Sequence, residues 1–265
     1  MDLDNQESIN GKDLTLVTRE ALSIAGEQLK ESFRLAEPKI SFKGRRDVVT
    51  DVDFAIEKSV KDFLLKEFPD YGFLGEELGI VNLDSPFRWV LDPIDGTANF
   101  AKGIPNIATT LSLTYLGEPI IGGTLDPPRD HLFFAEKDKG FTFNNKSMKF
   151  SPVENFESAT IGLDMGPDEV LVRNTLEVAL GILPVHRIRI MGSAALGLAY
   201  VAAGWFDLYM HLELKPWDVA AGLLFIKESN PDLVCVGPGF DTADLETKKF
   251  LAGNRTLVKQ CEFWQ

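Results

Sequence analysis

The apolar residues of the first 70 positions recur at the spacing of helices. Over residues 13–37 they step by three and four positions, which places them on one face of a helix that ends before Pro38. The same spacing recurs over residues 52–68 and stops at Pro69. A short basic and polar segment, residues 43–50, separates the two stretches and is typical of a hairpin. The pattern predicts two amphipathic helices in this part of the chain.

Short apolar runs separated by turns follow from residue 89 onward. Residues 89–91 form an apolar run typical of a buried strand. Further runs with strand composition are joined by turns rich in glycine, proline and asparagine, and they cover residues 109–115, 119–125, 131–135 and 141–143. Short strands connected in this way favour an antiparallel meander.

Strands and helices alternate in the second half of the chain. The pattern predicts strands near residue 160 and at 186–190 and 206–210, and helices at 169–180, 193–203 and 217–228. Such alternation is typical of an α/β unit. No repeat or linker-like tract marks a boundary. We therefore expect an α+β subdomain, residues 1–150, and an α/β subdomain, residues 151–265, that meet at a compact junction.

Composition and charge narrow the function classes. The 265 residues are 45% hydrophobic and 25% charged, as in ordinary globular proteins. The 27 basic and 40 acidic residues give a formal net charge of -13, which disfavours direct binding to nucleic acid or to an anionic membrane. The same charge opposes an anionic substrate unless bound cations reverse the local potential.

The chain carries no sign of a targeting segment or of a cysteine framework. The first thirty residues are acidic where a signal peptide would need a basic start. The longest weakly polar stretch, residues 194–205, is shorter than the roughly 20 residues of a membrane span. Cys235 and Cys261 form no CxxC motif and have no nearby histidine pair, which argues against a zinc site or a disulfide framework. These features predict a cytoplasmic protein that contacts no membrane.

The sequence DPIDGT, which follows a short apolar run, has the clearest chemical signature. Asp92, Asp95 and the carbonyl of Ile94 offer three oxygen ligands, and oxygen is the ligand that Mg²⁺ prefers. Gly96 and Thr97 would then open a helix whose free N–H groups suit a phosphate. The alternative is a structural turn at the end of a strand, with Asp95 capping a helix.

Three other short sequences carry candidate chemistry, and each has a structural alternative. Glu76 is one of a pair of glutamates at the end of a short apolar run, and such pairs are common in solvated loops. The sequence MGSAA at residues 191–195 could hold an anion or simply pack tightly at the start of a helix. Asp218 ends the sequence PWD, and proline with an acidic neighbour is how many helices begin.

Five short sequences follow one another in a recognisable order: DVVTD at residues 47–51, then GEE, DPIDGT, MGSAA and WDVAAG. This order resembles the inositol monophosphatase family of Mg²⁺-dependent, lithium-sensitive sugar phosphatases, over about residues 15–230. The resemblance implies a layered αβαβα sandwich made of an α+β half and an α/β half. It also implies metal ions between the two halves, most of their ligands in the first half, and a homodimer.

The resemblance further implies a role for each motif residue. Two or three Mg²⁺ ions would be held by Glu76, Asp92, the carbonyl of Ile94, Asp95 and Asp218, with Asp92 between two of the ions. Asp47 and Thr97 would orient and help to deprotonate the attacking water, and Glu76 counts with them as catalytic. The implied substrate contacts are Asp95, Gly96, Thr97, Gly192, Ser193, Ala194, His211 and Asp218.

One position departs from the pattern of the family. Seven positions before the final aspartate, where inositol-preferring members have an acidic residue, this chain has His211. A neutral imidazole accepts one hydrogen bond and donates one, so it replaces an acceptor-only carboxylate with different chemistry. We therefore expect a bisphosphate or another sugar phosphate to be preferred over inositol 1-phosphate.

The sequence as a whole predicts Mg²⁺-dependent hydrolysis of a small sugar or polyol phosphate monoester, such as inositol phosphate or fructose 1,6-bisphosphate. Two enzymatic alternatives are a 3′-phosphoadenosine bisphosphate phosphatase and a histidinol phosphatase. A non-enzymatic alternative is a regulatory protein that binds RNA polymerase or RNA. The complete set of metal-ligand positions favours catalysis, and the acidic charge disfavours direct contact with RNA.

Overall fold

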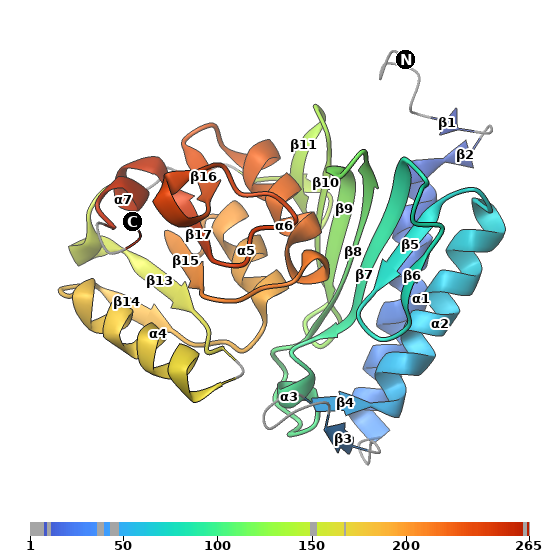
Figure 1. The fold of residues 1–265 in the computed structure, drawn as a ribbon, viewed down its shortest axis with the longest axis horizontal. Helices are drawn as coiled ribbons and strands as arrows, with labels where there is room; N and C mark the ends of the chain where they lie inside the picture. The colour runs from blue at the N-terminus through green and yellow to red at the C-terminus, as the bar shows by residue number, and fades with distance from the viewer. Residues whose placement is uncertain are drawn as a thin grey trace.

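The elements of the protein stack in five layers, helix on sheet on helix on sheet on helix (Figure 1). One outer layer holds α1 (Leu14–Leu35) and α2 (Asp51–Glu67), and the other holds α4 (Glu169–Gly181). Between the two sheets lie α5 (Ala194–Ala202) and α6 (Pro216–Ser229). The expected αβαβα sandwich is confirmed. The computed structural model describes residues 8–9, 12–35, 40–42, 48–148, 153–166, 168–261 and 264.

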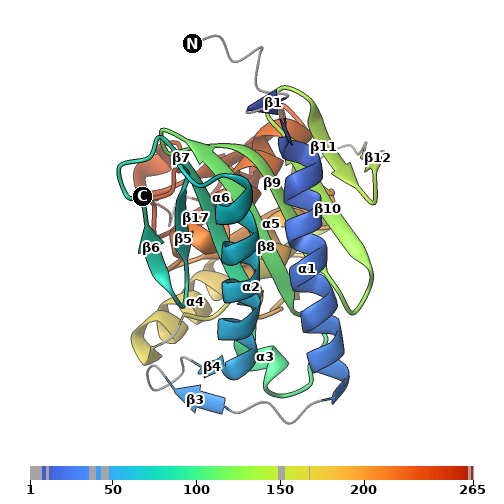
Figure 2. The same cartoon turned by 90° about the vertical axis from the view of Figure 1, so that its right-hand side faces the viewer.

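The outer helices α1 and α2 lie side by side across one face of the larger sheet (Figure 2). Their apolar faces are buried, and Ile56 and Leu64 of α2 are fully inaccessible. α2 begins after Thr50, whose hydroxyl accepts the N–H of Val52 while the Asp53 carboxylate accepts the N–H of Thr50 at 2.9 Å. This reciprocal cap fixes the start of the helix. Both predicted helices are confirmed.

The larger sheet orders its described strands β12-β11-β10-β9-β8-β7-β5-β6. These strands are β5 (Gly72–Gly75), β6 (Gly79–Val81), β7 (Phe87–Asp95), β8 (Ala108–Tyr115), β9 (Glu118–Asp126), β10 (His131–Glu136), β11 (Gly140–Phe143) and β12 (Lys146–Ser147). Consecutive strands from β7 to β12 pair antiparallel, which confirms the predicted meander. β5 instead runs parallel to β7 and pairs Gly75 with Leu91, so both strands end at the same edge of the sheet.

The smaller sheet orders its described strands β14-β13-β15-β17-β16. These are β13 (Thr160–Leu163), β14 (Arg187–Arg189), β15 (Leu208–His211), β16 (Leu233–Val236) and β17 (Phe250–Asn254). β13, β14 and β15 run parallel, and together with α4, α5 and α6 they confirm the predicted alternation of strands and helices. The antiparallel strands β16 and β17 close the sheet.

The remaining described elements are short. They are β1 (Ser8–Ile9), β2 (Lys12–Asp13), β3 (Ile40–Phe42), β4 (Val48–Thr50), α3 (Thr97–Phe100), α7 (Arg255–Lys259) and the 3-10 turns η2 (Phe156–Ser158) and η3 (Pro238–Phe240). β3 and β4 form an antiparallel pair, with β3 just before the predicted hairpin segment and β4 at its end. Residues 43–47, which include Asp47, lie outside the described residues.

One apolar core joins the two sheets. Phe133 and Ala135 of β10 belong to the same buried cluster as Leu198 of α5 and as Val219 and Phe225 of α6. Residues on both sides of position 150 therefore pack into a shared interior, and the helices between the sheets are held on both faces. None of the described helices is both long and apolar enough to span a bilayer.

Candidate active site

The predicted metal ligands lie where strands of the larger sheet end beside the start of α6. Because β5 and β7 are parallel neighbours, Glu76 follows β5 at the edge where β7 carries Asp92 and Asp95. α6 packs against β7 and brings Asp218 in its first turn. The structure thus gathers four carboxylates that are up to 142 positions apart, from Glu76 to Asp218, into one region between the sheets.

The DPIDGT segment bends the end of β7. β7 pairs regularly with β8 as far as Asp92, and the register shifts before Asp95. Proline cannot donate to the ladder, and an irregularity of this kind redirects the side chains around it. Asp92 Oδ1 accepts the N–H of Ile94 at 2.9 Å, and the carbonyl of Ile94 accepts the hydroxyl of Thr97 at 2.9 Å. Local hydrogen bonds therefore fix two of the three oxygen ligands predicted in this segment, those of Asp92 and Ile94.

Asp95 faces the other half of the molecule. Its carboxylate accepts the Ser193 hydroxyl, the N–H of Ala194 at 3.1 Å and the N–H of Ala195 at 2.9 Å. Burial raises the pKa of Asp95 to about 6 in spite of these bonds. The capping alternative is therefore realised, but Asp95 caps α5, a helix 99 positions further along the chain, rather than the short helix α3 that follows it.

The carboxylates raise one another's pKa. Burial raises the pKa of Asp92 well above its ordinary value, and the charges of Glu76, Asp95 and Asp218 raise it further. Burial also raises the pKa of Asp218, and the charge of Asp95 adds to this effect even though Asp218 accepts the N–H of Lys215 at 2.8 Å. Carboxylates this strongly opposed to ionisation are stabilised by a cation among them.

The donor chemistry fits a hard divalent ion such as Mg²⁺, because every predicted ligand is an oxygen and the centre is negative. Among the residues that the structure describes, no three carboxylate, imidazole or thiol side chains stand close enough together to bind one ion as they are placed. The ligands are thus assembled in one region without forming a closed cage.

Two acidic residues that sequence analysis missed support this region. Asp53 accepts the Thr97 hydroxyl at 3.3 Å, and burial raises the pKa of Asp53 to about 6. Glu57 accepts the N–H groups of Glu77 and Leu78, both at 2.8 Å, and so fixes the turn that carries Glu76. The spacing Thr50-x-x-Asp53 is a capping signal that could have located Asp53, but nothing local marks its contact with Thr97.

The turn at residues 191–194 lies across from these carboxylates. Met191 is half-buried, Gly192 is exposed, and Ser193 and Ala194 are buried at the start of α5. Asp164, which sequence analysis also missed, accepts the hydroxyl of Tyr209 at 2.9 Å and the N–H of Gly192 at 2.6 Å. The predicted substrate turn therefore lies beside Asp95. The side chains in this group of contacts, Asp95, Asp164 and Tyr209, belong to three separate segments of the chain.

His211 ends β15 and is buried. It shares a face of the strand with Tyr209, because alternate residues of a strand point the same way, and Tyr209 reaches Asp164 behind the substrate turn. The Nδ1 atom of His211 accepts the N–H of Glu213 at 3.0 Å. Burial lowers the pKa of His211 to about 4, so the ring is neutral at pH 7 and carries its proton on Nε2. Its remaining polar group is a donor.

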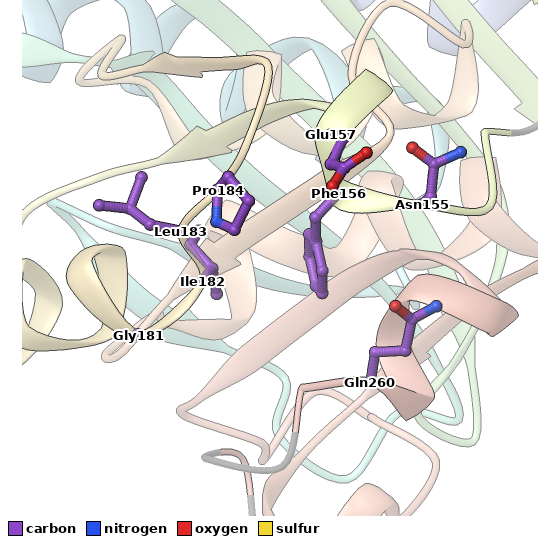
Figure 3. A pocket seen from close by; sticks show the side chains of 8 residues that line it. All are labelled: Asn155, Phe156, Glu157, Gly181, Ile182, Leu183, Pro184 and Gln260. Atoms are coloured by element: carbon purple, nitrogen blue, oxygen red, sulfur yellow. The ribbon is translucent and has the colours of Figure 1, made fainter.

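Two surface pockets lie away from these residues. One, of about 810 Å³, lies between α6, β16 and the loop before β17. The other, of about 720 Å³, has Leu183 and Pro184 on one side and Phe156 and Gln260 on the other (Figure 3). Neither pocket is lined by a predicted site residue. The carboxylate region is therefore identified by its chemistry.

Comparison with known proteins gives consistent matches. The model of the inositol monophosphatase family matches residues 11–262. A fructose-1,6-bisphosphatase/inositol-1-monophosphatase of Aquifex aeolicus is 34% identical, over 91% of this chain and 90% of that protein. The Nus factor SuhB of Xylella fastidiosa is 32% identical, over 91% and 90%. The crystal structure of the extragenic suppressor protein suhB from Bartonella henselae superposes with a TM-score of 0.86 at 32% identity, over 94% of this chain and 96% of that one.

The fold and these matches define a hydrolase of phosphoric monoesters. The chain belongs to the inositol monophosphatase family. The resemblance noted in the sequence is thereby confirmed, and so is the prediction of an enzyme. The family acts as phosphatases of phosphorylated sugars or polyols and is generally Mg²⁺-dependent.

Proposed function

We propose that this chain hydrolyses a small sugar phosphate at the carboxylates between its two sheets, and that it prefers a bisphosphate over inositol 1-phosphate. The observation that carries the proposal is the burial of Asp92, Asp95 and Asp218 in one region, where burial raises the pKa of each and the charges of Glu76 and Asp95 add to the rise at Asp92 and Asp218, an environment that favours a bound divalent cation. The relative from Aquifex aeolicus, whose name joins fructose-1,6-bisphosphatase and inositol-1-monophosphatase, supports this range of substrates.

The metal ligands in this proposal are Glu76, Asp92, the carbonyl of Ile94, Asp95 and Asp218, and they hold two or three Mg²⁺ ions. When bound, Mg²⁺ neutralises the phosphoryl oxygens and lowers the pKa of the attacking water. Most of these ligands belong to the half up to residue 150. The half from residue 151 completes the site with Asp218 and the substrate turn. We therefore propose that the first subdomain supplies most of the metal ligands and that the second completes the metal and substrate site.

Thr97 orients the attacking water in this proposal, and Asp53 takes part with it. The Thr97 hydroxyl lies within hydrogen-bond distance of both Asp53 Oδ1 and the Ile94 carbonyl, so it can pass its proton to Asp53 while it accepts one from water. A carboxyl with a pKa of about 6 is suited to exchanging a proton near neutral pH. Asp47 and Glu76 complete the catalytic set proposed from the sequence.

His211 decides substrate preference in this proposal. Because Nδ1 is already bonded to Glu213, the ring offers the substrate only the N–H of Nε2. A phosphate group accepts such a bond readily, whereas the site lacks the acidic acceptor that inositol-preferring members present to a hydroxyl. Gly96, Gly192, Ser193 and Ala194 line the phosphate side of the same pocket.

Phosphate release measured over inositol 1-phosphate, fructose 1,6-bisphosphate, 3′-phosphoadenosine 5′-phosphate and histidinol phosphate, with Mg²⁺ and with a chelator, tests the proposal. We expect release that requires Mg²⁺ and is fastest with the sugar bisphosphate. Fastest release from the nucleotide or from histidinol phosphate would replace the substrate assignment. No release from any of these compounds would favour a regulatory role, which the relationship to a Nus factor SuhB keeps as the second candidate.

A homodimer is part of the proposal. Large apolar side chains stay exposed on α4 and just after it, with Leu180 at 69%, Leu183 at 56% and Leu176 at 48%. Such a concentration of apolar surface is typical of an interface. Sedimentation velocity on Leu180→Glu tests this, because a charge there would shift a dimer toward monomer, whereas an unchanged oligomeric state would move the interface elsewhere.

A further inference from the structure

The backbone of the turn at Met191 and Gly192 is held by two side chains from different halves of the molecule. Asp164 Oδ1 accepts both N–H groups, at 2.7 and 2.6 Å. Asn99 Nδ2 donates to both carbonyls, at 2.8 and 3.1 Å. We propose that Asn99 is a positioning residue that docks this turn onto the DPIDGT segment and thereby sets how tightly substrate is held. This rests on the proposed function of the turn as part of the phosphate pocket.

The docking is close. Asn99 Nδ2 also donates to the carbonyl of Asn106 at 2.8 Å. The two N–H groups of one side-chain amide are therefore shared among the carbonyls of three residues. A Cβ atom on Gly96 would stand 2.8 Å from the carbonyl oxygen of Asn106 and 2.9 Å from that of Gly192. Gly96 also has a φ of 91°, which side chains rarely adopt. The two turns therefore touch through backbone, and the contact leaves no room for a larger residue.

Asn99 is itself supported by a chain of hydrogen bonds. Arg129 donates to the side chain of Asn106 at 2.6 Å and to the carbonyl of Pro105 at 2.7 Å. The same guanidinium donates at 2.7 Å to Asp126, whose side chain is fully buried. Asn106, whose carbonyl accepts a hydrogen bond from Asn99, is thus anchored to the end of β9, and Asn99 links that anchor to the turn.

Asn99 acts on different atoms from Asp95. Asp95 accepts the N–H groups of Ala194 and Ala195, whereas Asn99 donates to the carbonyls of Met191 and Gly192. Only a side chain that donates hydrogen bonds can hold carbonyls, so aspartate at position 99 would meet them with a negative charge. Because none of the hydrogen bonds described for Asn99 involves a proposed metal ligand, its loss should loosen the turn and weaken substrate binding more than it slows the chemical step.

Asn99→Asp tests the proposal, with Asn82→Asp as the matched control. Asn82 Nδ2 also donates to two carbonyls, those of Tyr71 at 3.0 Å and Pro69 at 3.3 Å, but it lies before the start of β7, at the end away from Asp92. Hydrogen exchange of the amides of residues 191–193 reports docking without any substrate. We expect exchange at least about tenfold faster in Asn99→Asp and unchanged in Asn82→Asp.

The kinetic arm uses the best phosphomonoester of the wild-type protein with saturating Mg²⁺. We expect KM to rise about tenfold in Asn99→Asp while kcat changes less than about threefold, and Asn99→Gln, which keeps the amide, to recover part of the loss. If Asn99→Asp does not fold, Asn99→Ser serves for both arms. Unchanged exchange and unchanged KM would overturn the proposal, as would the same change at the turn in Asn82→Asp. If the wild-type protein had no phosphatase activity, the proposed function would be refuted but the docking role of Asn99 would not. The hydrogen-exchange experiment tests that role without any activity.

Discussion

The two sides of the site are built by different means. On the acidic side, backbone pairing places the residues, because β5 and β7 end at the same edge of the sheet. Within the DPIDGT segment, Asp92, Ile94 and Thr97 are joined by local hydrogen bonds. On the substrate side, the turn at residues 191–194 pairs with none of the strands that the structure describes, and distant side chains hold it. A site built by strands should tolerate the loss of one side chain without unfolding, whereas a site held by side chains should loosen.

The largest effect should come from Asp92→Asn on the acidic side. An amide supplies no charge to the cations and leaves the fold intact, so we expect turnover to fall by about a thousandfold or more while the far-ultraviolet circular dichroism stays unchanged. Asp207→Asn is the control, because Asp207 is a partly buried carboxylate that also accepts a backbone N–H, that of Thr160 at 2.7 Å, and it directly precedes β15, at the end of the strand away from His211. Normal Mg²⁺-dependent turnover in Asp92→Asn would refute the assignment of this side.

Thr97→Ala should have the next largest effect. Its hydroxyl is the group that reaches both Asp53 and the Ile94 carbonyl, so we expect turnover to fall about a hundredfold with little change in the Mg²⁺ concentration at half-maximal rate. Asp47→Asn should behave alike, and Thr97→Ser should keep most activity. If excess Mg²⁺ restores the full rate, these residues hold metal rather than water.

The stability of the metal-free protein should fall as pH rises from about 4 to 7. Burial raises the pKa of Asp53 and of Asp95 to about 6, so these two groups bind more protons in the folded protein than in the unfolded chain over this range, and the free energy of unfolding decreases; His211, whose pKa burial lowers to about 4, acts in the opposite sense but is one group against two. We expect a loss of roughly 1–3 kcal/mol, measured by denaturant titration in chelator. Adding Mg²⁺ at pH 7 should reverse it. A free energy of unfolding that rises over this pH range without metal would contradict the prediction that the buried carboxylates of the acidic side lack compensating positive charge.

The smallest effect should come from His211→Glu on the substrate side. A carboxylate restores an acceptor for a sugar hydroxyl and repels a second phosphate, so the ratio of kcat/KM for inositol 1-phosphate to that for fructose 1,6-bisphosphate should rise about tenfold. His211→Gln, which removes the imidazole without adding charge, should give an intermediate ratio. A ratio that does not move would show that His211 is only a buried structural residue.

The amino-acid sequence by itself determined the elements whose signal is local. The three- and four-residue spacing of apolar positions predicted α1 and α2 within one or two residues, and short runs between turns predicted the meander from β7 to β11. The order of the motifs predicted the family and the acidic residues that follow β5 and lie at the end of β7. These signals can be recognised in the sequence because they arise from residues close together in the chain and do not depend on contacts with distant segments.

Only the tertiary structure decided which groups meet across the site. Asp95 caps α5, Asn99 and Asp164 hold the turn before it, and Asp53 supports Thr97, although periodicity and motif spacing mark none of these contacts. Each joins positions between 27 and 100 residues apart. Such a bond forms because the packing of the layers brings both segments together, so its partners follow from that packing and not from any stretch of sequence around either residue.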